Sequence, residues 1–461
     1  AMMGRQATGR EQLFYSFSME DHVPEDHLLR GIHRFLDLGS FRQHMEAFYS
    51  PIGRPSVDPE LMIRMLIVGY CFGIRSERRL CEEVHLNLAY RWFCRLGLED
   101  PVPNHSTFSK NRHGRFRESD AFRQVFEGVL ARCMAEGLVR GEGFATDASI
   151  IKADANVGNR APGSEPIDWG DPDEATRPVR EYLAALAEVN DPPPPFKAVS
   201  LTDPAASWTN RGGPSYFAYS TNYLIDLKAG IIIDVEPSAV SKAAEVSATR
   251  TMIERVEDRF DLKPERLVGD TNYGSAALLG SLVDEKQIEP HVRVCDQTER
   301  RDGTLSASAF TWLAQSNEYR CPAGKPLRSD WRSFNHPRSH ITLADTIIYR
   351  ARQPDCAACP LKSQCCPNMP SRKIHRSIHE DARNVARQIA TTPAYEQSCR
   401  ERKKVEMLFA HLKRILKLDK LRLRGFSGAG DEFLLAATAQ NLRKMAKWIM
   451  ATTDKPSLEP E

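Results

Sequence analysis

The stretch "SYFAYSTNYLIDLKAGIIIDVEPSAV", residues 215–240, decides the fold. Its β-branched and aromatic residues indicate two strands, and "LKAG" at 227–230 supplies a tight turn between them. The second strand begins with the apolar run 231–233. A sheet is therefore expected near the middle of the chain.

Strand and helix patterns continue on both sides of this pair. Another strand is expected before it, in "GFATDASIIKADAN" at 143–156. After it we expect a helix at about 243–260, a strand ending at Asp270, a further helix and a strand at 290–294. The order strand, strand, strand, helix, strand, helix, strand predicts a mixed α/β fold.

Two segments interrupt this order. The first, at about 157–213, contains four consecutive prolines at 192–195 and is expected to be a flexible or partly helical excursion. The second, 296–395, is rich in Cys, Arg, His and Pro. A helical pattern resumes at 396–450 and is followed by a polar tail, 451–461.

Residues 1–137 predict an all-helical domain. One helix has Asp58 as its N-cap and Pro59 in its first turn. Farther along, "PNHSTFSKNRHGRF" at 103–116 predicts a turn, a cap at Ser106 or Thr107, and a short basic helix. Such a helix is typical of a DNA recognition helix and equally of a solvated surface. The candidate DNA contacts on it are Lys110, Arg112 and Arg115.

The composition is that of an ordinary globular protein, with 41% apolar and 27% charged residues. The longest apolar stretch, 65–74, is half the length of a membrane span, and the N-terminus lacks the pattern of a secretion signal. We therefore expect a cytoplasmic protein without a membrane partner. The net charge is only +2. The stretch from Arg400 to Arg424, however, contains ten Lys/Arg and only three Asp/Glu, which suits a phosphate-binding surface or a solvated helix face.

Three carboxylates are candidates for one site: Asp147 in the first strand, Asp270 at the end of a later strand, and Glu406 on a late helix beside Arg402 and Lys413. Taken singly, Asp270 could be a helix cap and Glu406 a surface partner of Arg402. Together they could hold one or two divalent cations, with coordination positions left for phosphate oxygens and water. Asp154 lies at an odd offset from Asp147, so we assign it a structural role.

These motifs resemble the DDE transposases of bacterial insertion sequences. That family has a Tyr-x2-Arg-x3-Glu-x6-Lys signature, and this chain has Cys399, Arg402, Glu406 and Lys413 at those positions, so three of four match. The blocks "ATDASIIKADAN" and "VGDTNYGS", the strand "GIIIDVEPSA" and the helical "NHSTFSKNR" region resemble the family in the same order, over roughly residues 50–450.

The resemblance implies a ribonuclease-H-like α/β core, a mixed five-stranded sheet with flanking helices, interrupted by insertions and preceded by an all-α domain. The implied organisation is a helical DNA-binding domain, the first part of the core, a cysteine-containing insertion, C-terminal helices that complete the core, and a tail, at residues 1–137, 138–295, 296–395, 396–450 and 451–461.

The resemblance also implies the activity. Asp147, Asp270 and Glu406 would bind Mg²⁺ or Mn²⁺, with Arg402 and Lys413 assisting catalysis. Water would cut the ends of the insertion sequence, and the freed 3′-hydroxyl would attack target DNA without a covalent enzyme intermediate. The partners would be the terminal inverted repeats and target DNA, bound by at least a dimer in the bacterial cytoplasm and at the nucleoid. Lys403 and Lys417 are further candidate DNA contacts.

Three other functions fit the same motifs. The chain could be a catalytically silent DNA-binding protein derived from a transposase, or a metal-dependent DNA nuclease without strand transfer. A zinc-stabilised structural protein that binds no DNA is a third alternative.

A second metal site is suggested by the cysteines of the insertion. Cys321, Cys356, Cys359 and Cys365 supply soft ligands for a structural Zn²⁺, and a Cys-x2-Cys pair is a common source of two of them. The fourth ligand is ambiguous, because Cys366 or His375 could replace Cys321. Free thiols, or the remnants of a lost site, are the alternative.

Overall fold

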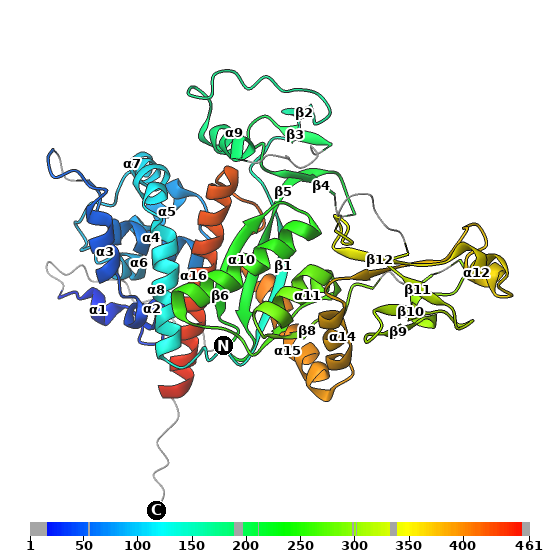
Figure 1. Cartoon of the computed structure of the whole chain (residues 1–461). Helices are drawn as coiled ribbons and strands as arrows, with labels where there is room; N and C mark the ends of the chain where they lie inside the picture. Colours follow the sequence, from blue (N-terminus) through cyan, green and yellow to red (C-terminus); the bar gives the residue numbers. More distant parts are fainter. Residues whose placement is uncertain are drawn as a thin grey trace, which may run out of the picture.

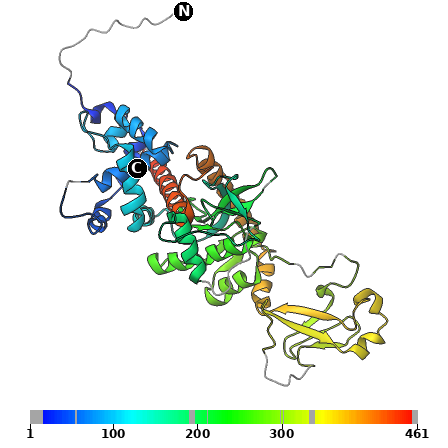
Figure 2. The ribbon, with the colours of Figure 1, turned by 90° about the horizontal axis from the view of Figure 1, so that it is seen from above.

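The computed structural model describes residues 16–53, 56–188, 197–210, 212–296, 299–300, 302–331 and 339–453 (Figure 1). It has a helical N-terminal part, a central mixed sheet covered by helices, and a second sheet in the insertion (Figures 1 and 2). In Figure 2 these three parts follow one another along the molecule. The prolines at 192–195 and most of the tail lie outside the described residues.

The central sheet has the strand order β4-β5-β1-β7-β8, and β6 also pairs with β5. β5 is antiparallel to β1, β4 and β6, whereas β1, β7 and β8 run parallel to one another. The strands are β1 Phe144–Lys152, β4 Ser207–Thr209, β5 Tyr216–Asp226, β6 Ile232–Ser238, β7 Arg266–Val268 and β8 Glu289–His291. The expected mixed α/β fold is confirmed.

The expected order of elements is also found, as β1, β5, β6, α10, β7, α11 and β8. Two details differ. The sheet gains a sixth strand, β4, which is too short to show a period in the sequence, and the last strand is β8 Glu289–His291 rather than 290–294. The helices between the strands are α10 Lys242–Phe260 and α11 Ala276–Gly280.

Helices cover the sheet on both faces, which explains the almost continuous burial of β5. Successive residues of β1 point to opposite faces. Thr146 shares a 2.8 Å hydrogen bond with Thr249 of α10, whereas Asp147 lies 3.8 Å from Arg402 of α15, Pro393–Arg414. α10 and α15 therefore cover opposite faces of β1, in front of and behind the sheet in Figure 1.

The long helix α16, Gly425–Thr453, joins the N-terminal helices to the sheet. It packs against α2, α4 and α8 on one side and against β6 on the other. The buried Asn441 side chain exchanges two 2.8 Å hydrogen bonds with the backbone of Ile232. The apolar residues of all these elements form one continuous core, so the change of pattern near residue 137 marks a change of secondary structure and not a break in packing.

The N-terminal part is helical, as expected. Asp58 caps α4 through the backbone N–H groups of Glu60 and Leu61, with Pro59 in the first turn. The cap of α7 differs from the expectation: Asn104, not Ser106 or Thr107, accepts the hydrogen bond from the N–H of Ser106. The helices are α1 Met19–His22, α2 Leu28–Phe35, α3 Gly39–Glu46, α4 Pro59–Cys71, α5 Glu77–Leu86, α6 Leu88–Phe93, α7 His105–Asn111, a π-helix Arg112–Phe116, and α8 Ala121–Ala135.

The two interruptions have structure of their own. The excursion contains a two-stranded sheet and one helix: β2 Arg160–Pro162, β3 Ala198–Ser200 and α9 Arg177–Glu188. The insertion holds a five-stranded sheet of order β13-β12-β11-β10-β9 with its own buried cluster. Its elements are β9 Thr311–Leu313, β10 Glu318–Arg320, β11 Pro326–Arg328, β12 Thr346–Ala351, β13 Lys373–Ser377, α12 Gln353–Ala357, α13 Lys362–Cys365 and α14 Glu380–Ile389.

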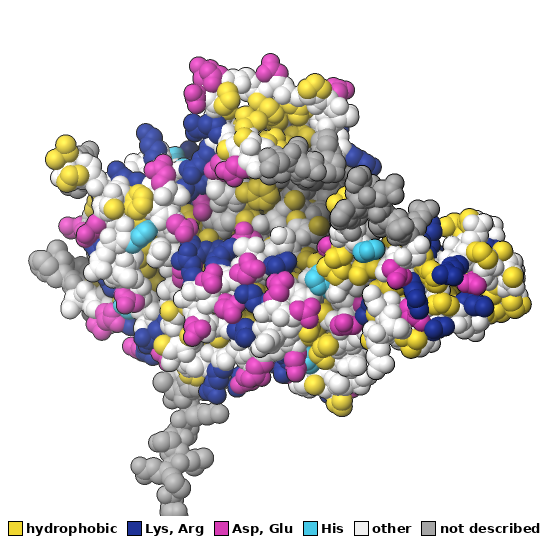
Figure 3. All heavy atoms as spheres, in the orientation of Figure 1, with side chains coloured by type: hydrophobic (Ala, Val, Ile, Leu, Met, Phe, Trp, Pro, Cys, Tyr) yellow, Lys and Arg dark blue, Asp and Glu magenta, His cyan; other side chains and the backbone are white. Residues whose placement is uncertain are grey.

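Positive and negative side chains are interspersed over the face shown in Figure 3, in keeping with the small net charge. Among the described residues, no helix is both long and apolar enough to cross a membrane.

Candidate active site

Asp147 lies in β1, and Asp270 lies two residues beyond the end of the neighbouring strand β7. Ala145 of β1 pairs with Val268 of β7 in a parallel ladder, and each aspartate follows two residues later. Residues two apart along a strand share a face, and paired strands are about 4.8 Å apart. Both carboxylates therefore lie at the same edge of the sheet, at the carboxyl end of β7, where ligands of α/β sheets commonly bind.

Burial raises the pKa of Asp147 from its ordinary value of 3.8 to about 6. The N–H of Ala148 and the guanidinium of Arg402 lower this pKa, while the charges of Asp270 and Glu245 raise it. The Asp147 side chain is 21% exposed, so a solvent path to it remains. Desolvation and the neighbouring negative charges therefore both oppose ionisation of Asp147 at this site.

A stability measurement tests this burial. An acid whose pKa is higher in the folded than in the unfolded chain destabilises the fold as pH rises between the two values. Asp147→Asn should therefore stabilise the metal-free protein by about 1–3 kcal/mol at pH 8 and hardly at all at pH 3.5. Urea unfolding in EDTA at the two pH values measures the difference, and an equal effect at both would contradict a raised Asp147 pKa.

Asp270 also has a local structural role. Its carboxylate accepts a hydrogen bond of 2.7 Å from the N–H of Asn272 and caps the 3₁₀ turn Thr271–Tyr273. The cap interpretation that its sequence left open is therefore correct. A cap uses one carboxylate oxygen and leaves the other with only a 3.3 Å contact to the Asn272 amide, so capping and ligand binding are compatible.

α15 carries the residues of the third motif along β1. Arg402 lies 3.8 Å from Asp147, and the Lys413 ammonium donates to the carbonyl of Ile150 at 3.3 Å. Glu406 falls between them on the helix but is exposed. The helix is anchored by the buried side chains of Val405, Leu408 and Leu412, while Phe409 is partly buried against Tyr223.

The three carboxylates do not form a closed metal-binding set. In the part of the chain that the structure describes, no three His, Cys, Asp or Glu side chains lie close enough to hold one metal ion. Asp147 and Asp270 are neighbours, and Arg402 and Lys413 reach β1, but Glu406 does not join a three-residue cluster with the aspartates.

Two further residues near the aspartates, Glu245 and Tyr273, were not predicted from the sequence. Glu245, in the first turn of α10, accepts a 2.6 Å hydrogen bond from Ser220, and its charge raises the pKa of Asp147. Burial raises the pKa of Tyr273, and the charges of Asp147, Glu245 and Asp270 add to the shift. An acid in the first turn of a helix is ordinarily a helix-dipole partner, so only the topology of the sheet could have singled out Glu245.

Asp154 lies beyond the end of β1 and forms ion pairs of 3.1 Å with Lys420 and Arg424. The Nε of Arg424 also donates to the carbonyl of Asp154 at 2.8 Å. These contacts fasten the segment after α15 to the end of β1. They agree with the structural role expected for Asp154.

The candidate DNA contacts fall into two groups. Lys110, Lys403 and Lys417 are exposed, and Arg115 is half-buried over the Tyr49 ring with hydrogen bonds to Ser56 and Asn111. Arg112 requires a correction. It is 4% exposed, pairs with Glu77 at 3.0 Å and donates to the hydroxyl of Tyr70, so it stabilises the helical core and does not present its charge to DNA.

The cysteines of the insertion gather around one small cavity of about 30 Å³. Its lining includes Cys321, Cys356, Cys359, Cys365 and Cys366. His375, the other ligand considered, is exposed and lines a different cavity. All five cysteines are free thiols, and no three of the described thiols are yet at ligating separations. The N–H of Lys325 donates to the Cys321 sulfur at 3.3 Å.

Comparison with protein families indicates the class of protein: two separate stretches of the chain match transposase domain families. Residues 17–114 match the family described as "Transposase domain (DUF772)", and residues 320–446 match "Transposase DDE domain". These matches indicate a transposase, an enzyme that acts on DNA. The second match includes the insertion cysteines and Glu406, whereas Asp147 and Asp270 lie between the two matches. Neither the curated proteins nor the solved structures that were compared gave a match.

Proposed function

We propose that this transposase binds the ends of an insertion sequence and cuts and joins DNA with a carboxylate site built on Asp147, Asp270 and Glu406. The observation that carries the proposal is the register of β1 and β7, which sets the two aspartates side by side with Arg402 of α15 against the first. The strand order β6-β5-β1-β7-β8 supports a ribonuclease-H-like core.

The residues suit a divalent cation such as Mg²⁺ or Mn²⁺. Carboxylate oxygens are the ligands that these hard ions prefer, and the mutual repulsion of Asp147, Asp270 and Glu245 is the condition that a cation relieves. Asp147 and Asp270 would hold the ion, with Glu406 as the third ligand of the DNA-bound enzyme. The bound ion supplies an activated water or hydroxyl and charge stabilisation at the phosphorus.

The chain's own groups account for substrate orientation. Arg402 can donate to a non-bridging phosphate oxygen while it remains beside Asp147, because a guanidinium has five N–H donors. Lys413 is held by the carbonyl of Ile150 on the same edge of the sheet. The N-terminal helices would bind the terminal repeats through Lys110 and Arg115, and Lys403 and Lys417 would contact the DNA backbone. Because the insertion sequence has two ends, at least a dimer would be needed to process both.

The test uses a supercoiled plasmid that carries the sequences flanking the gene. With Mg²⁺ or Mn²⁺ we expect nicking at the inverted repeats and joining of the freed 3′-hydroxyl ends to a second plasmid. Binding of the repeats without nicking would identify a catalytically silent descendant. Nicking without joining, even with pre-cut 3′-hydroxyl ends, would identify a nuclease.

We further propose that the insertion binds a structural Zn²⁺ through four of the five cysteines around its small cavity. The cavity exceeds the space of one water, and the sulfurs approach it from three separate segments of the chain. Closure onto an ion would complete a core that is otherwise small.

Metal analysis of purified protein tests this proposal. We expect about one zinc per chain. Cys356→Ser and Cys365→Ser should each lose that zinc and lower the thermal midpoint of the insertion, because a structural zinc contributes directly to folding. The matched control is Cys399→Ser, an exposed cysteine outside the cavity, which should leave the zinc content unchanged. Zinc-free wild-type protein, purified without chelators, would contradict the proposal.

A further inference from the structure

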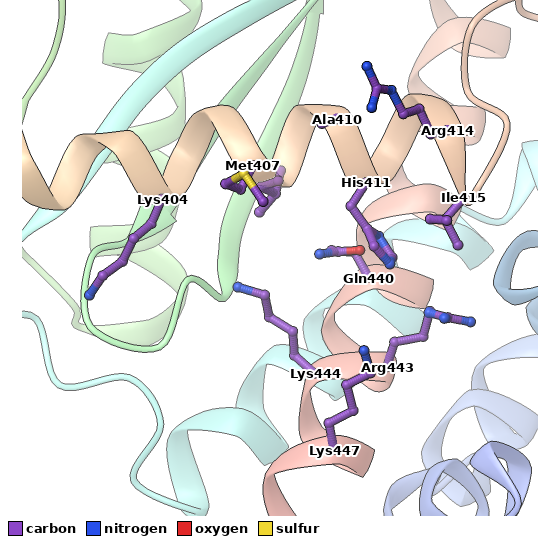
Figure 4. A pocket seen from close by; sticks show the side chains of 11 residues that line it. Lys404, Met407, Ala410, His411, Arg414, Ile415, Gln440, Arg443, Lys444 and Lys447 are labelled. Atoms are coloured by element: carbon purple, nitrogen blue, oxygen red, sulfur yellow. The ribbon is translucent and has the colours of Figure 1, made fainter.

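A groove of about 440 Å³ lies between α15 and α16, on the side of α15 that faces away from β1 (Figure 4). Arg402 and Lys413 reach β1 from one side of α15, whereas Lys404 and His411, about half a turn around the helix, line the groove. An α-helix with its side chains is about 10 Å across. The groove is therefore separate from the candidate active site but belongs to the same helix.

The groove is cationic. Its lining contains no Asp or Glu and includes Lys404 and Arg414 from α15 and Arg443, Lys444 and Lys447 from α16. Within the described chain, none of these five cations forms an ion pair with a carboxylate, unlike the largely buried side chains of Arg75, Arg112 and Arg117. In Figure 4, the side chains of Lys404 and Lys444 lie on the same side of α15.

Lys444 shows the cost of this arrangement. Burial lowers its pKa to about 8, and the charge of Lys404 also lowers it, although Asp226 acts in the opposite direction. Its ammonium donates to the carbonyls of Ala229 and Gly230, at 3.1 and 2.6 Å, and these neutral partners do not compensate its charge. Positive charges that the fold brings together without anions favour an anionic ligand.

The lining also suits a long ligand. Met407 is 72% exposed and Ile415 is 46% exposed at the groove, so the cations border an apolar strip instead of a closed pocket for a small anion. Phosphates spaced along a nucleic-acid strand match cations spaced over several helix turns.

We propose that the groove between α15 and α16 binds the phosphate backbone of duplex DNA outside the reacting nucleotides. The inference rests on the proposed function, since it names a second DNA contact of the same enzyme. Because one helix carries both the groove and Arg402, DNA held in the groove would fix the position of α15 relative to the DNA at β1.

The experiment measures binding of the full-length protein to a 40-base-pair duplex of arbitrary sequence by fluorescence anisotropy over a series of NaCl concentrations. Each lost phosphate contact reduces the log–log salt slope by about one. Lys404→Gln should reduce it by about one, and Lys404→Gln with Lys447→Gln by about two, with roughly tenfold weaker binding at low salt. The matched control is Lys263→Gln, an exposed lysine beside Glu254, Glu257 and Asp258, which should change neither quantity.

A second measurement does not depend on the stability of those variants. A photoreactive p-benzoylphenylalanine at Met407 should crosslink to the duplex, and the same residue at Lys263 should not. An unchanged salt slope together with no crosslink at Met407 would overturn the groove proposal alone, whereas wild-type protein without salt-dependent DNA binding would overturn the proposed function as well. If the lysine variants bound polyglutamate more weakly than the wild-type protein but bound DNA as tightly, the groove would be assigned to an acidic protein partner. This result would also overturn the proposal.

Discussion

Asp147→Asn and Asp270→Asn are each expected to reduce plasmid nicking by at least about 10²–10³-fold while binding of the DNA ends is retained. The physical reason is specific to the carboxylate: the amide has nearly the same shape but loses the negative charge and one acceptor oxygen. Nicking at matched protein and Mg²⁺ concentrations measures the effect, and anisotropy with the same DNA measures binding.

Asp154→Asn is the matched control. Asp154 belongs to the same sequence stretch and carries the same side chain, but its carboxylate is occupied by Lys420 and Arg424. Its replacement weakens partly exposed ion pairs, each worth at most about 1 kcal/mol, and should change nicking less than about fivefold. Nicking that survives Asp147→Asn and Asp270→Asn would remove both aspartates from the chemistry.

A comparison of variants at Glu406 and Glu245 identifies the third carboxylate ligand. Glu406 has the position of the family signature but is exposed, whereas Glu245 is close enough to influence Asp147. If the signature identifies the ligand, Glu406→Gln should be as severe as Asp147→Asn, and Glu245→Gln should be milder. The opposite ranking would move the third ligand to α10 and would show that the signature helix serves DNA and not the metal.

Much of the core could be predicted from the sequence because its signals are local. The strands β1, β5 and β6 and the helix α10 are long enough to show their periods, and Asp58 with Pro59 is a strong start signal for α4. β4 is only three residues long, so its place in the sheet depends on pairing with β5 and not on its own pattern.

The candidate site was predictable only in part, because local sequence signals do not show which residues pack together. A carboxylate at a strand end can be recognised along the chain, but its neighbours depend on packing. Arg112 has the same sequence pattern as an exposed basic residue, and only the fold shows that Glu77 and Tyr70 enclose it. Glu245 likewise comes near Asp147 through the packing of α10 on the sheet.

The largest effect on stability is expected at Glu432, which no sequence motif identified. This residue of α16 is fully buried and pairs with the nearly buried Arg75. Its other carboxylate oxygen accepts hydrogen bonds of 2.5 Å from the N–H groups of Arg422 and Leu423. Removing one partner of a buried ion pair leaves the other charge uncompensated, so Glu432→Ala should lower the free energy of unfolding by about 3–5 kcal/mol.

Urea unfolding compares this variant with two others. Arg400→Gln breaks an exposed pair with Glu396 in α15 and should cost no more than about 1 kcal/mol. Arg75→Met combined with Glu432→Gln should recover part of the loss, because the double variant buries no unpaired charge. A loss at Glu432→Ala as small as that at Arg400→Gln would show that the buried pair contributes little.

Glu432→Ala should also affect the candidate active site. The segment held by Glu432 continues the chain from α15, and it is joined to the end of β1 by hydrogen bonds between Lys152 and both Asp419 and Leu421, at 3.3 and 2.8 Å. When Glu432 is lost, α15 is held less firmly against β1, and Arg402 with it. Glu432→Ala should therefore reduce nicking at temperatures well below its own unfolding midpoint, whereas Arg75→Met with Glu432→Gln should restore part of it. Unchanged nicking in folded Glu432→Ala protein would show that α15 keeps its place without this anchor.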